Sequence, residues 1–378
     1  MTLEKTRLRL GIVPLADCAP IVVAKERGFF AEQGLDVDIS REPSWANIRD
    51  KVAVGALDGA QMLATMPLSM TLGLAGIREP VVAGMALNLG GNTITLATAL
   101  CRRIESLGSL KAAVAAGGEP MTFAMVYPFS THHYELRLWL AAQGIDPDRD
   151  VRLVVVPPPQ MVAHLSAGNI QGFCVGEPWG SLAASLGLGE VVATSDDIFA
   201  GRIEKVFGVA RAWADAHPAT HQAVLRALIA AAGWCDDNPA EVAEILAQPG
   251  YVNVPLEIVR SGLGLTVFHR HAANFPWRSH AEWFLGQMRL WGHVGGVDAR
   301  RLAEETFRPD LYRLAALELG LPVPLVDHKT EGDHAGPWQL AKATAPIAMG
   351  PDRMIGGTRF DPFAPQADSP ALVQETLP

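Results

Sequence analysis

Five residues that can donate hydrogen bonds or positive charge lie at the ends of predicted strands or at the starts of predicted helices. They are Trp45, Asn92, His132, Gly176 and Lys205. A helix start offers unpaired N–H groups and a partial positive charge, and a glycine lets the backbone approach a ligand closely. Lysine adds a full charge, while indole and amide N–H groups add donors without charge. Together these residues would form a pocket for a small anion.

Each of the five also fits an ordinary structural role. The tryptophan could be a core aromatic residue, the asparagine and the glycine could be turn residues, and the histidine could simply begin a helix. Lys205 could be a surface lysine paired with Glu204. From spacing alone, the sequence supports only a two-lobed protein that binds a small molecule.

The sequence contains none of the common catalytic or cofactor motifs. It has no GxxxxGK[ST] phosphate loop, no dinucleotide fingerprint after a strand, no GxSxG and no HExxH. The histidines of His269-Arg270-His271 lack helical i,i+4 spacing and a nearby cysteine, which favours a polar surface turn over a metal site. Asp196-Asp197 fits helix capping better than a pair of catalytic carboxylates. We therefore predict no enzyme, no catalytic residue, no metal and no cofactor.

Composition narrows the class of protein. The 378 residues are 49% hydrophobic and 19% charged, enough for a sizeable core, and the net charge of -9 argues against direct nucleic-acid binding. The four cysteines are far apart and form no CxxC pair, as expected in a reducing compartment. We find no apolar run of about 18 residues, the length of a membrane span. The N-terminus does not resemble a secretory signal. We expect a cytoplasmic protein without a membrane span.

Strands and helices alternate along the first half of the chain. Predicted strands lie at 8–13, 35–40, 60–64 and 81–89, and the pattern restarts near residue 93 with strands at 121–126, 151–156, 172–175 and 191–194. Such alternation indicates an α/β fold with mainly parallel sheets. Residues 106–117 read as a helix and loop, and after a strand at 205–210 the chain reads as helices to about residue 319.

We predict two lobes, one inserted into the other. Residues 1–92 would begin lobe 1, 93–198 would form lobe 2, and 199–321 would return to lobe 1 as a largely helical segment. The Pro- and Gly-containing tail, 322–378, would be extended and partly mobile. A ligand would bind between the lobes.

Several segments resemble the nitrate/bicarbonate-binding proteins of ABC transporters. The segments are DCAPIVVAKERGFF (17–30), SWANIRD (44–50), GALDGA (55–60), VPPPQMV (156–162) and FCVGEPW (173–179). The resemblance covers most of residues 8–320. It implies an α/β, two-lobed periplasmic-binding-protein-like (type II) fold, a C-shaped clamp with an interlobe cleft. Carried over residue by residue, it implies oxyanion contacts at Trp45, Asn92, His132, Gly176 and Lys205.

Three of these positions bear on which anion could bind and on which side chain would contact it. Asn92 stands where the resemblance leads us to expect glutamine, so it keeps an amide but has a shorter reach. His132 and His133 are adjacent, and either could make the contact. In the bicarbonate branch a carboxylate and a calcium ion are expected at the position of Lys205, whereas a lysine implies a monovalent anion without metal.

The transporter proteins of this family are exported, so the absence of an export signal makes the chain similar to the cytoplasmic nitrate/nitrite-sensor branch (NasS-like). That resemblance implies that nitrate or nitrite controls an ANTAR-type RNA-binding antitermination regulator (NasT-like). The alternative is the substrate-binding protein of a nitrate/nitrite ABC transporter. A thiamine-pyrimidine enzyme would need a cysteine-rich motif, and a domain fused to an ATPase would need a Walker sequence. The preference between nitrate and nitrite, the oligomeric state and the partner's docking face stay open.

Overall fold

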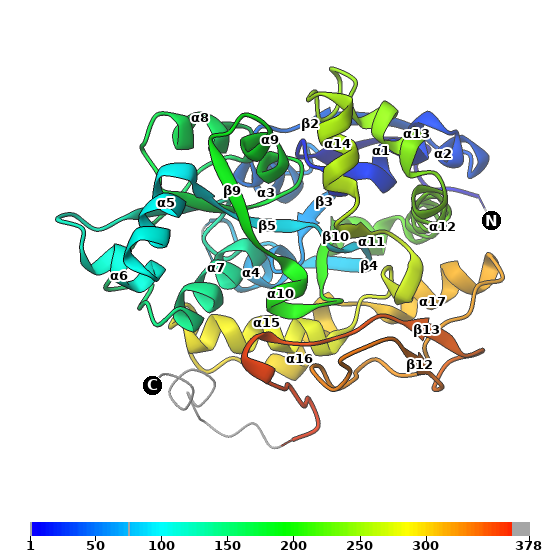
Figure 1. The fold of residues 1–378 in the computed structure, drawn as a ribbon. Coiled ribbons are helices and arrows are strands. Elements are labelled where there is room, and N and C mark those ends of the chain that lie inside the picture. Colours follow the sequence, from blue (N-terminus) through cyan, green and yellow to red (C-terminus); the bar gives the residue numbers. More distant parts are fainter. Residues whose placement is uncertain (1, 75, 365–378) are drawn as a thin grey trace.

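The computed structural model describes residues 2–74 and 76–364, which form two lobes, each built around a β-sheet (Figure 1). The first sheet has six strands in the order β11-β4-β10-β3-β1-β2, and the second has five in the order β7-β6-β8-β5-β9. The strands of the first sheet are β1 (Arg7–Ile12), β2 (Asp36–Arg41), β3 (Gly59–Leu63), β4 (Val81–Gly90), β10 (Ile203–Ala210) and β11 (Thr266–Val267). Those of the second are β5 (Asn92–Ala97), β6 (Thr122–Met125), β7 (Arg152–Val155), β8 (Gly172–Gly176) and β9 (Gly189–Thr194).

The chain passes between the sheets twice, after β4 and after β9, so the second lobe is inserted into the first. Both sheets are mixed, although the sequence predicted mainly parallel ones. β1 pairs in parallel with β2 and β3, but β10 is antiparallel to both β3 and β4, and β5 is antiparallel to β8 and β9. The reason is the crossing itself: β4 leaves the first lobe where β10 re-enters it, so the two strands run in opposite directions.

The helices of the first lobe cover its sheet and continue along the chain after β10 (Figure 1). They are α1 (Ala19–Glu26), α2 (Phe29–Glu32), α3 (Trp45–Ala53), α4 (Met66–Leu72), α11 (Arg211–Ala216), α12 (Pro218–Asp237), α13 (Pro239–Leu246), α14 (Leu256–Leu263), α15 (Arg278–Leu290), α16 (Ala299–Thr306) and α17 (Pro309–Glu318). The 3₁₀ helix η1 (Ala16–Cys18) leads into α1.

The second lobe contains α5 (Thr98–Leu107), α6 (Leu110–Ala115), α7 (Thr131–Ala142), α8 (Met161–Ser166), α9 (Trp179–Ser185) and α10 (Ser195–Phe199). Sequence reasoning missed β5 and α5 and placed one helix at 106–117, where the structure has the end of α5, a turn and α6. β5 has the alternating, β-branched sequence NTITLA, typical of a strand, but it follows β4 after a single residue. The predicted strand at 81–89 ends just before β5, and the sequence-based prediction places β5 in the connection that follows.

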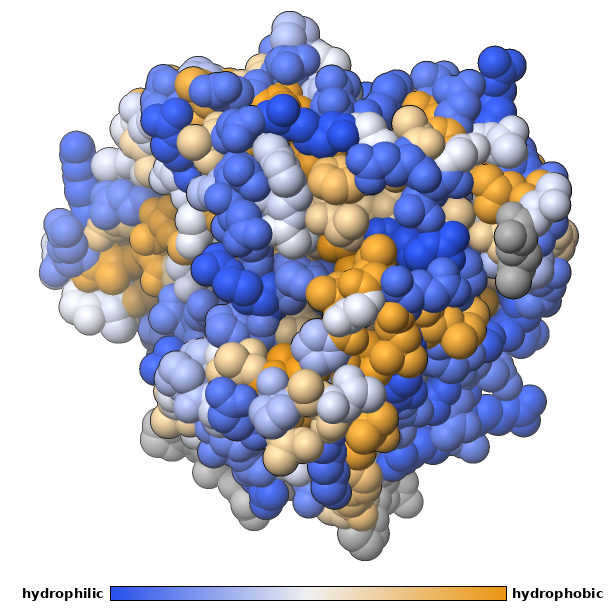
Figure 2. Space-filling model, turned by 90° about the vertical axis from the view of Figure 1, so that its right-hand side faces the viewer, coloured by the Kyte–Doolittle hydropathy of each residue, from blue (hydrophilic) through white to orange (hydrophobic). Residues whose placement is uncertain are grey.

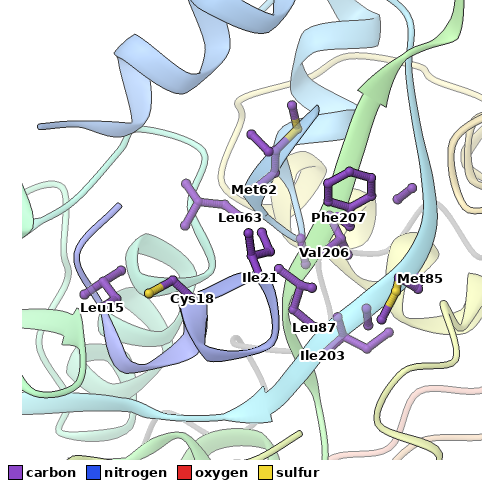
Figure 3. Packing of buried hydrophobic residues seen from close by; sticks show 14 of the residues in the cluster. Leu15, Cys18, Ile21, Met62, Leu63, Met85, Leu87, Ile203, Val206 and Phe207 are labelled. Atoms are coloured by element: carbon purple, nitrogen blue, oxygen red, sulfur yellow. The ribbon is translucent and has the colours of Figure 1, made fainter. Parts of the chain in front are cut away.

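The largest core cluster extends from the sheet of the first lobe to η1 and α1 (Figure 3). Met62 and Leu63 of β3 lie beside Val206 and Phe207 of β10, with Ile21 of α1 close by. These side chains are fully shielded from solvent. Any charged group on β10 or η1 that points into this region is therefore removed from water and needs a partner.

The C-terminal segment is more ordered than the sequence predicted. Its described part contains the antiparallel pair β12 (Trp338–Leu340) and β13 (Ile347–Met349), which runs along the first lobe (Figure 1). Lys329 forms an ion pair with the fully buried Glu331, which also lies 3.2 Å from His280 of α15. Buried charges that are paired in this way hold the segment in place. Residues 365–378 of the predicted tail lie outside the described residues.

One face of the molecule carries several separate hydrophobic patches among polar side chains (Figure 2). Among the exposed hydrophobic residues, Leu314 and Leu317 of α17 are each more than half exposed. Scattered exposed hydrophobic residues are normal on soluble proteins. Among the helices of the described residues, none is long and apolar enough to cross a membrane.

Candidate functional site

The five predicted site residues come from different elements and meet where the lobes touch. Trp45 begins α3, and Lys205 lies in β10 of the first lobe. Asn92 begins β5, His132 is the second residue of α7, and Gly176 ends β8, all in the second lobe. All five are buried, and Asn92 and Gly176 face each other as a pair in the β5–β8 ladder. The ammonium of Lys205 lies 5.6 Å from the centre of the Trp45 ring.

Three of these residues carry polar atoms without any hydrogen-bond partner. The atoms are the indole Nε1 of Trp45, the amide Oδ1 of Asn92 and the imidazole Nε2 of His132. Leaving a buried polar group unsatisfied costs about 1–3 kcal/mol. Such groups are rare in folded proteins, and a ligand or an ordered water is the usual explanation. Their occurrence at three of the five predicted positions makes this region the candidate site for a polar ligand.

Lys205 is buried between two carboxylates, not free as the sequence suggested. Its Nζ lies 2.8 Å from Oδ2 of Asp17 and 2.9 Å from Oε1 of Glu204. Asp17 also accepts a hydrogen bond from the amide of Gln61 in β3. Lys205 and Glu204 are thus paired, as one structural interpretation expected, but both are fully buried, not at the surface.

A second buried cation lies beside the first pair. Arg202 forms an ion pair with Glu135 of α7 and lies 2.8 Å from Oε2 of Glu204. The hydroxyl of Thr131 donates a hydrogen bond to Glu204, so this one carboxylate joins both cations and the start of α7. The site is therefore a network in which each charge has a partner.

Asn92 is oriented differently from the sequence-based expectation. Its Nδ2 donates to Oε2 of Glu135 at 2.7 Å, so the atom left without a partner is the acceptor Oδ1. Glu135 takes the amide donor because a carboxylate is the stronger acceptor. Nδ2 carries a second N–H besides the one given to Glu135, so Asn92 can offer that donor to an anion, whereas its unpartnered Oδ1 can only accept.

The adjacent histidines are distinguished by geometry. His133 uses both ring nitrogens, with Nδ1 against the carbonyl oxygen of Pro128 and Nε2 accepting from Arg137 at 2.7 Å. His132 is fully buried and has the unpartnered Nε2. Of the two, His132 therefore has a ring nitrogen free of protein partners, and it stays the candidate for ligand contact.

The environment sets the protonation of the charged groups. Burial, reinforced by Lys205, lowers the pKa of His132 to about 3, so its ring is neutral near pH 7. Burial by itself would raise the pKa of Glu204. The positive charges of Lys205 and Arg202 outweigh burial and lower this pKa to about 2. Burial raises the pKa of Asp17 against the opposing effect of Lys205. Burial also raises the pKa of Glu135, although the positive charge of Arg202 acts in the opposite direction.

Sequence reasoning considered Glu204 only as a surface partner of Lys205, and it missed the other buried partners of the site, namely Asp17, Gln61, Thr131, Glu135 and Arg202. A signal was present, because charged residues interrupt apolar runs at Asp17 and at Glu204. Charge inside an apolar element is uncommon unless it is paired. Glu204 pairs with its neighbours Lys205 and Arg202, but Asp17 pairs with Lys205 far away along the chain, and spacing could not reveal that pairing.

The other candidate positions have structural roles. Asp197 accepts the backbone N–H of Thr194 in a capping box at the start of α10, as predicted. His269 contacts Oδ1 of Asn274, and His271 contacts the carbonyl oxygen of Ala348. Over the described ranges 2–74 and 76–364, no group of three or more His, Cys, Asp or Glu side chains is arranged to hold a metal ion.

Comparison with known proteins identifies the family. A model described as "NMT1-like family" matches residues 1–248. The chain belongs to the NMT1-like family. It is 31% identical to the nitrate/nitrite binding protein NrtA of Synechocystis sp. over 398 aligned positions, which cover 96% of this chain and 84% of NrtA. It is 41% identical to the nitrate import ATP-binding protein NrtC of the same organism, over 88% of this chain but 52% of NrtC.

The chain thus spans about half the length of the NrtC relative. The crystal structure of the periplasmic nitrate-binding protein NrtA from Synechocystis PCC 6803 overlaps the whole of both chains with a TM-score of 0.85 and 30% identity. This overlap confirms the predicted two-lobed, type II periplasmic-binding-protein fold for this member of the NMT1-like family. It also agrees with the prediction of a solute-binding protein, not an enzyme.

Proposed function

We propose that this chain binds nitrate or nitrite between its lobes. The observation that carries the proposal is the unpartnered indole N–H of Trp45, whose ring centre lies 5.6 Å from the buried ammonium of Lys205, together with the unpartnered Nε2 of His132 in the same buried region. Nitrate is a small planar anion with three acceptor oxygens, which suits several donors and one positive charge. Similarity to nitrate-binding relatives in the NMT1-like family supports the same ligand.

Binding would stabilise the closed arrangement of the lobes. In the structure the lobes are joined directly: the N–H of Ala16 donates to the carbonyl oxygen of Glu177 at 2.7 Å, and Nε1 of Trp179 donates to that of Pro14 at 3.1 Å. A ligand that contacts both lobes binds the closed state better than an open one, and it shifts the equilibrium by that difference. Coupling of about 1–3 kcal/mol between ligand and a partner is typical.

At a finer level, we propose a cytoplasmic nitrate/nitrite sensor that controls an ANTAR-type RNA-binding antitermination regulator. One comparison supports a role in sensing the ligand. The chain is 41% identical to NrtC, an ATP-binding protein of which it covers about half, and 31% identical to the binding protein NrtA. A binding module within an ATP-binding protein would report ligand occupancy, since it cannot carry solute away. Nitrate should then change how much purified regulator the chain retains on a column.

A second candidate is the binding protein of a nitrate/nitrite transporter, which the overlap with NrtA along both whole chains favours. Fractionation of the native cells distinguishes the sensor role from the transporter role. Recovery with the periplasmic fraction supports the transporter role, whereas recovery with the cytoplasm supports the sensor.

Thermal unfolding in the presence of candidate ligands tests anion binding. Nitrate, nitrite, bicarbonate with calcium, and an alkanesulfonate are compared, followed by calorimetry on any ligand that stabilises the protein. At 100 times its dissociation constant, a ligand adds about 2.7 kcal/mol to the free energy of unfolding. We expect this for nitrate or nitrite. Stabilisation by bicarbonate with calcium alone would overturn the proposal.

A double variant can remove the ammonium of Lys205 without leaving the carboxylate of Asp17 unpaired in the core. Lys205→Met alone would leave Asp17 unpaired in the core, at a cost of about 3–5 kcal/mol. The double variant Lys205→Met/Asp17→Asn avoids this. It should fold and bind no nitrate, while Trp45→Phe, which lacks one unpartnered donor, should bind it more weakly.

A further inference from the structure

The ammonium that the proposed anion needs is already occupied by a side chain of the protein. Oδ2 of Asp17 lies 2.8 Å from Nζ of Lys205, and both side chains are buried. A Cβ atom added to Gly176 would lie 3.2 Å from that same oxygen and 3.5 Å from Oδ1 of Asn92. The Asp17 carboxylate thus lies between the cation of the first lobe and the polar edge of the second, inside the site itself.

The net charge of the buried network limits what can bind there. Lys205 and Arg202 contribute two positive charges to the buried network, whereas ionised Asp17, Glu135 and Glu204 contribute three negative ones. With all groups ionised the network already carries one net negative charge. Adding an anion without any other change would bury a second one, which the low-dielectric interior disfavours.

Building on the proposed function, we propose that Asp17 is a ligand-binding carboxyl group that takes up one proton from solvent when the anion binds. The neutral carboxyl group then donates its hydrogen to an oxygen of the anion, and Lys205 pairs with the anion instead of with Asp17. One proton and one anion enter together, so the net charge of the buried network does not change. Asp17 would therefore control affinity as well as contact the ligand.

The groups around Asp17 support this assignment. Besides Lys205, β10 contributes Glu204, whose negative charge favours protonation of Asp17, and β3 contributes the neutral amide of Gln61. Burial is the main cause that raises the pKa of Asp17, and the negative charge of Glu204 adds to it. From α7, His132 is neutral near pH 7.

The remaining elements near Asp17 add no opposing charge. Beside it on η1, the thiol of Cys18 has a pKa raised by burial, so it too stays neutral. β4 has no titratable residue, and those of α1 and α14 are all exposed: Lys25, Glu26, Glu257 and Arg260. Directly after β8, the carboxyl group of Glu177 accepts hydrogen bonds from the hydroxyl of Thr93 and the backbone N–H of Ser181.

Proton uptake fixes the direction of the pH dependence. Asp17 holds a proton more readily at lower pH, so nitrate should bind more tightly as pH falls. For one proton the dissociation constant rises by up to tenfold per pH unit, over the interval between the pKa of Asp17 without ligand and its higher pKa with ligand. Nitrate itself does not titrate in the neutral range, so a change in affinity reports on the protein.

Calorimetry of the full chain with sodium nitrate between pH 6 and pH 8.5, in two buffers of different ionisation enthalpy, measures both affinity and protons. We expect net proton uptake on binding to the unaltered protein and an increase in the dissociation constant with pH. Asp17→Asn should remove both the uptake and the pH dependence. Glu177→Gln, a buried carboxyl of the same region that does not pair with Lys205, should retain both.

The outcomes separate this inference from the proposed function. Nitrate binding without proton uptake overturns the role of Asp17 and leaves anion binding intact. Uptake that persists undiminished in Asp17→Asn assigns the proton to another group, such as Glu135, and also overturns it. No nitrate binding at any pH overturns both. Should Asp17→Asn fail to fold, Glu135→Gln takes its place: uptake retained in Glu135→Gln supports Asp17, whereas loss of uptake assigns the proton to Glu135 and overturns the proposal.

Discussion

At the scale of single residues, the site combines donors that the residue types reveal with charges that they do not. Trp45, His132 and Lys205 were predicted from their positions at element ends, and the structure brings them together. Their role in binding stays a prediction. Sequence reasoning treated Lys205 as the counter-charge of the ligand, whereas its neighbours Asp17 and Glu204 already neutralise it. Any anion that pairs with Lys205 would have to compete with a carboxylate of the protein.

Gly176 offers a test of the space left for the ligand. A Cβ there would lie 3.2–3.5 Å from Asp17, Leu15 and Asn92, so Gly176→Ala fills room beside the polar atoms. We expect a nitrate dissociation constant at least about tenfold higher, measured by calorimetry, because one lost hydrogen bond to a charged group costs about 1.5–3 kcal/mol. The cost in stability should stay within about 1–3 kcal/mol.

The control for this prediction is Gly286→Ala in α15, where an added Cβ meets nothing within 4 Å. It should stabilise the protein by about 0.5–1 kcal/mol and leave nitrate affinity unchanged. Equal affinity in Gly176→Ala and the unaltered protein would show that Gly176 lies away from the ligand.

At the scale of elements, the start of α7 positions the histidine. The hydroxyl of Ser130 accepts the backbone N–H of His133 at 3.0 Å, which caps the helix and fixes the turn that carries His132. The sequence could not show the geometry that separates His132 from His133, because both lie on the same first turn. Their packing partners, the lobe interface for one and Arg137 for the other, make the distinction.

Ser130→Ala should loosen that turn. Loss of an N-cap costs about 0.5–2 kcal/mol, and we expect nitrate affinity to fall as well, because the His132 ring is no longer held in place. Urea unfolding and calorimetry measure the two effects. Ser109 caps α6 in the same way, away from the site, so Ser109→Ala should lower stability without changing affinity. If both variants bind nitrate equally well, the cap does not position the site.

At the scale of the whole molecule, lobe closure depends on a few direct contacts. Trp179 of α9 reaches across to the carbonyl oxygen of Pro14 through its indole N–H. Trp179→Phe keeps the ring packing and removes this bond, which is worth about 0.5–1.5 kcal/mol. Because only the closed state binds tightly, we expect nitrate affinity to fall by about 2- to 10-fold.

Trp213→Phe is the matched control for that prediction. Its indole N–H bonds to Asp58 at 2.8 Å within the first lobe, so its loss should affect stability but not closure. Small-angle scattering with and without nitrate should show a more open average shape for Trp179→Phe than for Trp213→Phe. The same shape and affinity for both would mean that the Trp179 bond does not contribute to closure.

The sequence by itself determined the two-lobed α/β fold and the five candidate positions, since hydrophobic periodicity, helix starts and glycines are local properties of the chain. Only the tertiary structure decided the antiparallel crossings of β10, the pairing of Lys205 with Asp17 and the choice of His132 over His133. Asp17 and Lys205 are far apart in the chain and meet only once η1 packs against β10. Burial then turns their charges into strong, competing interactions, and no local pattern records which charges will be buried together.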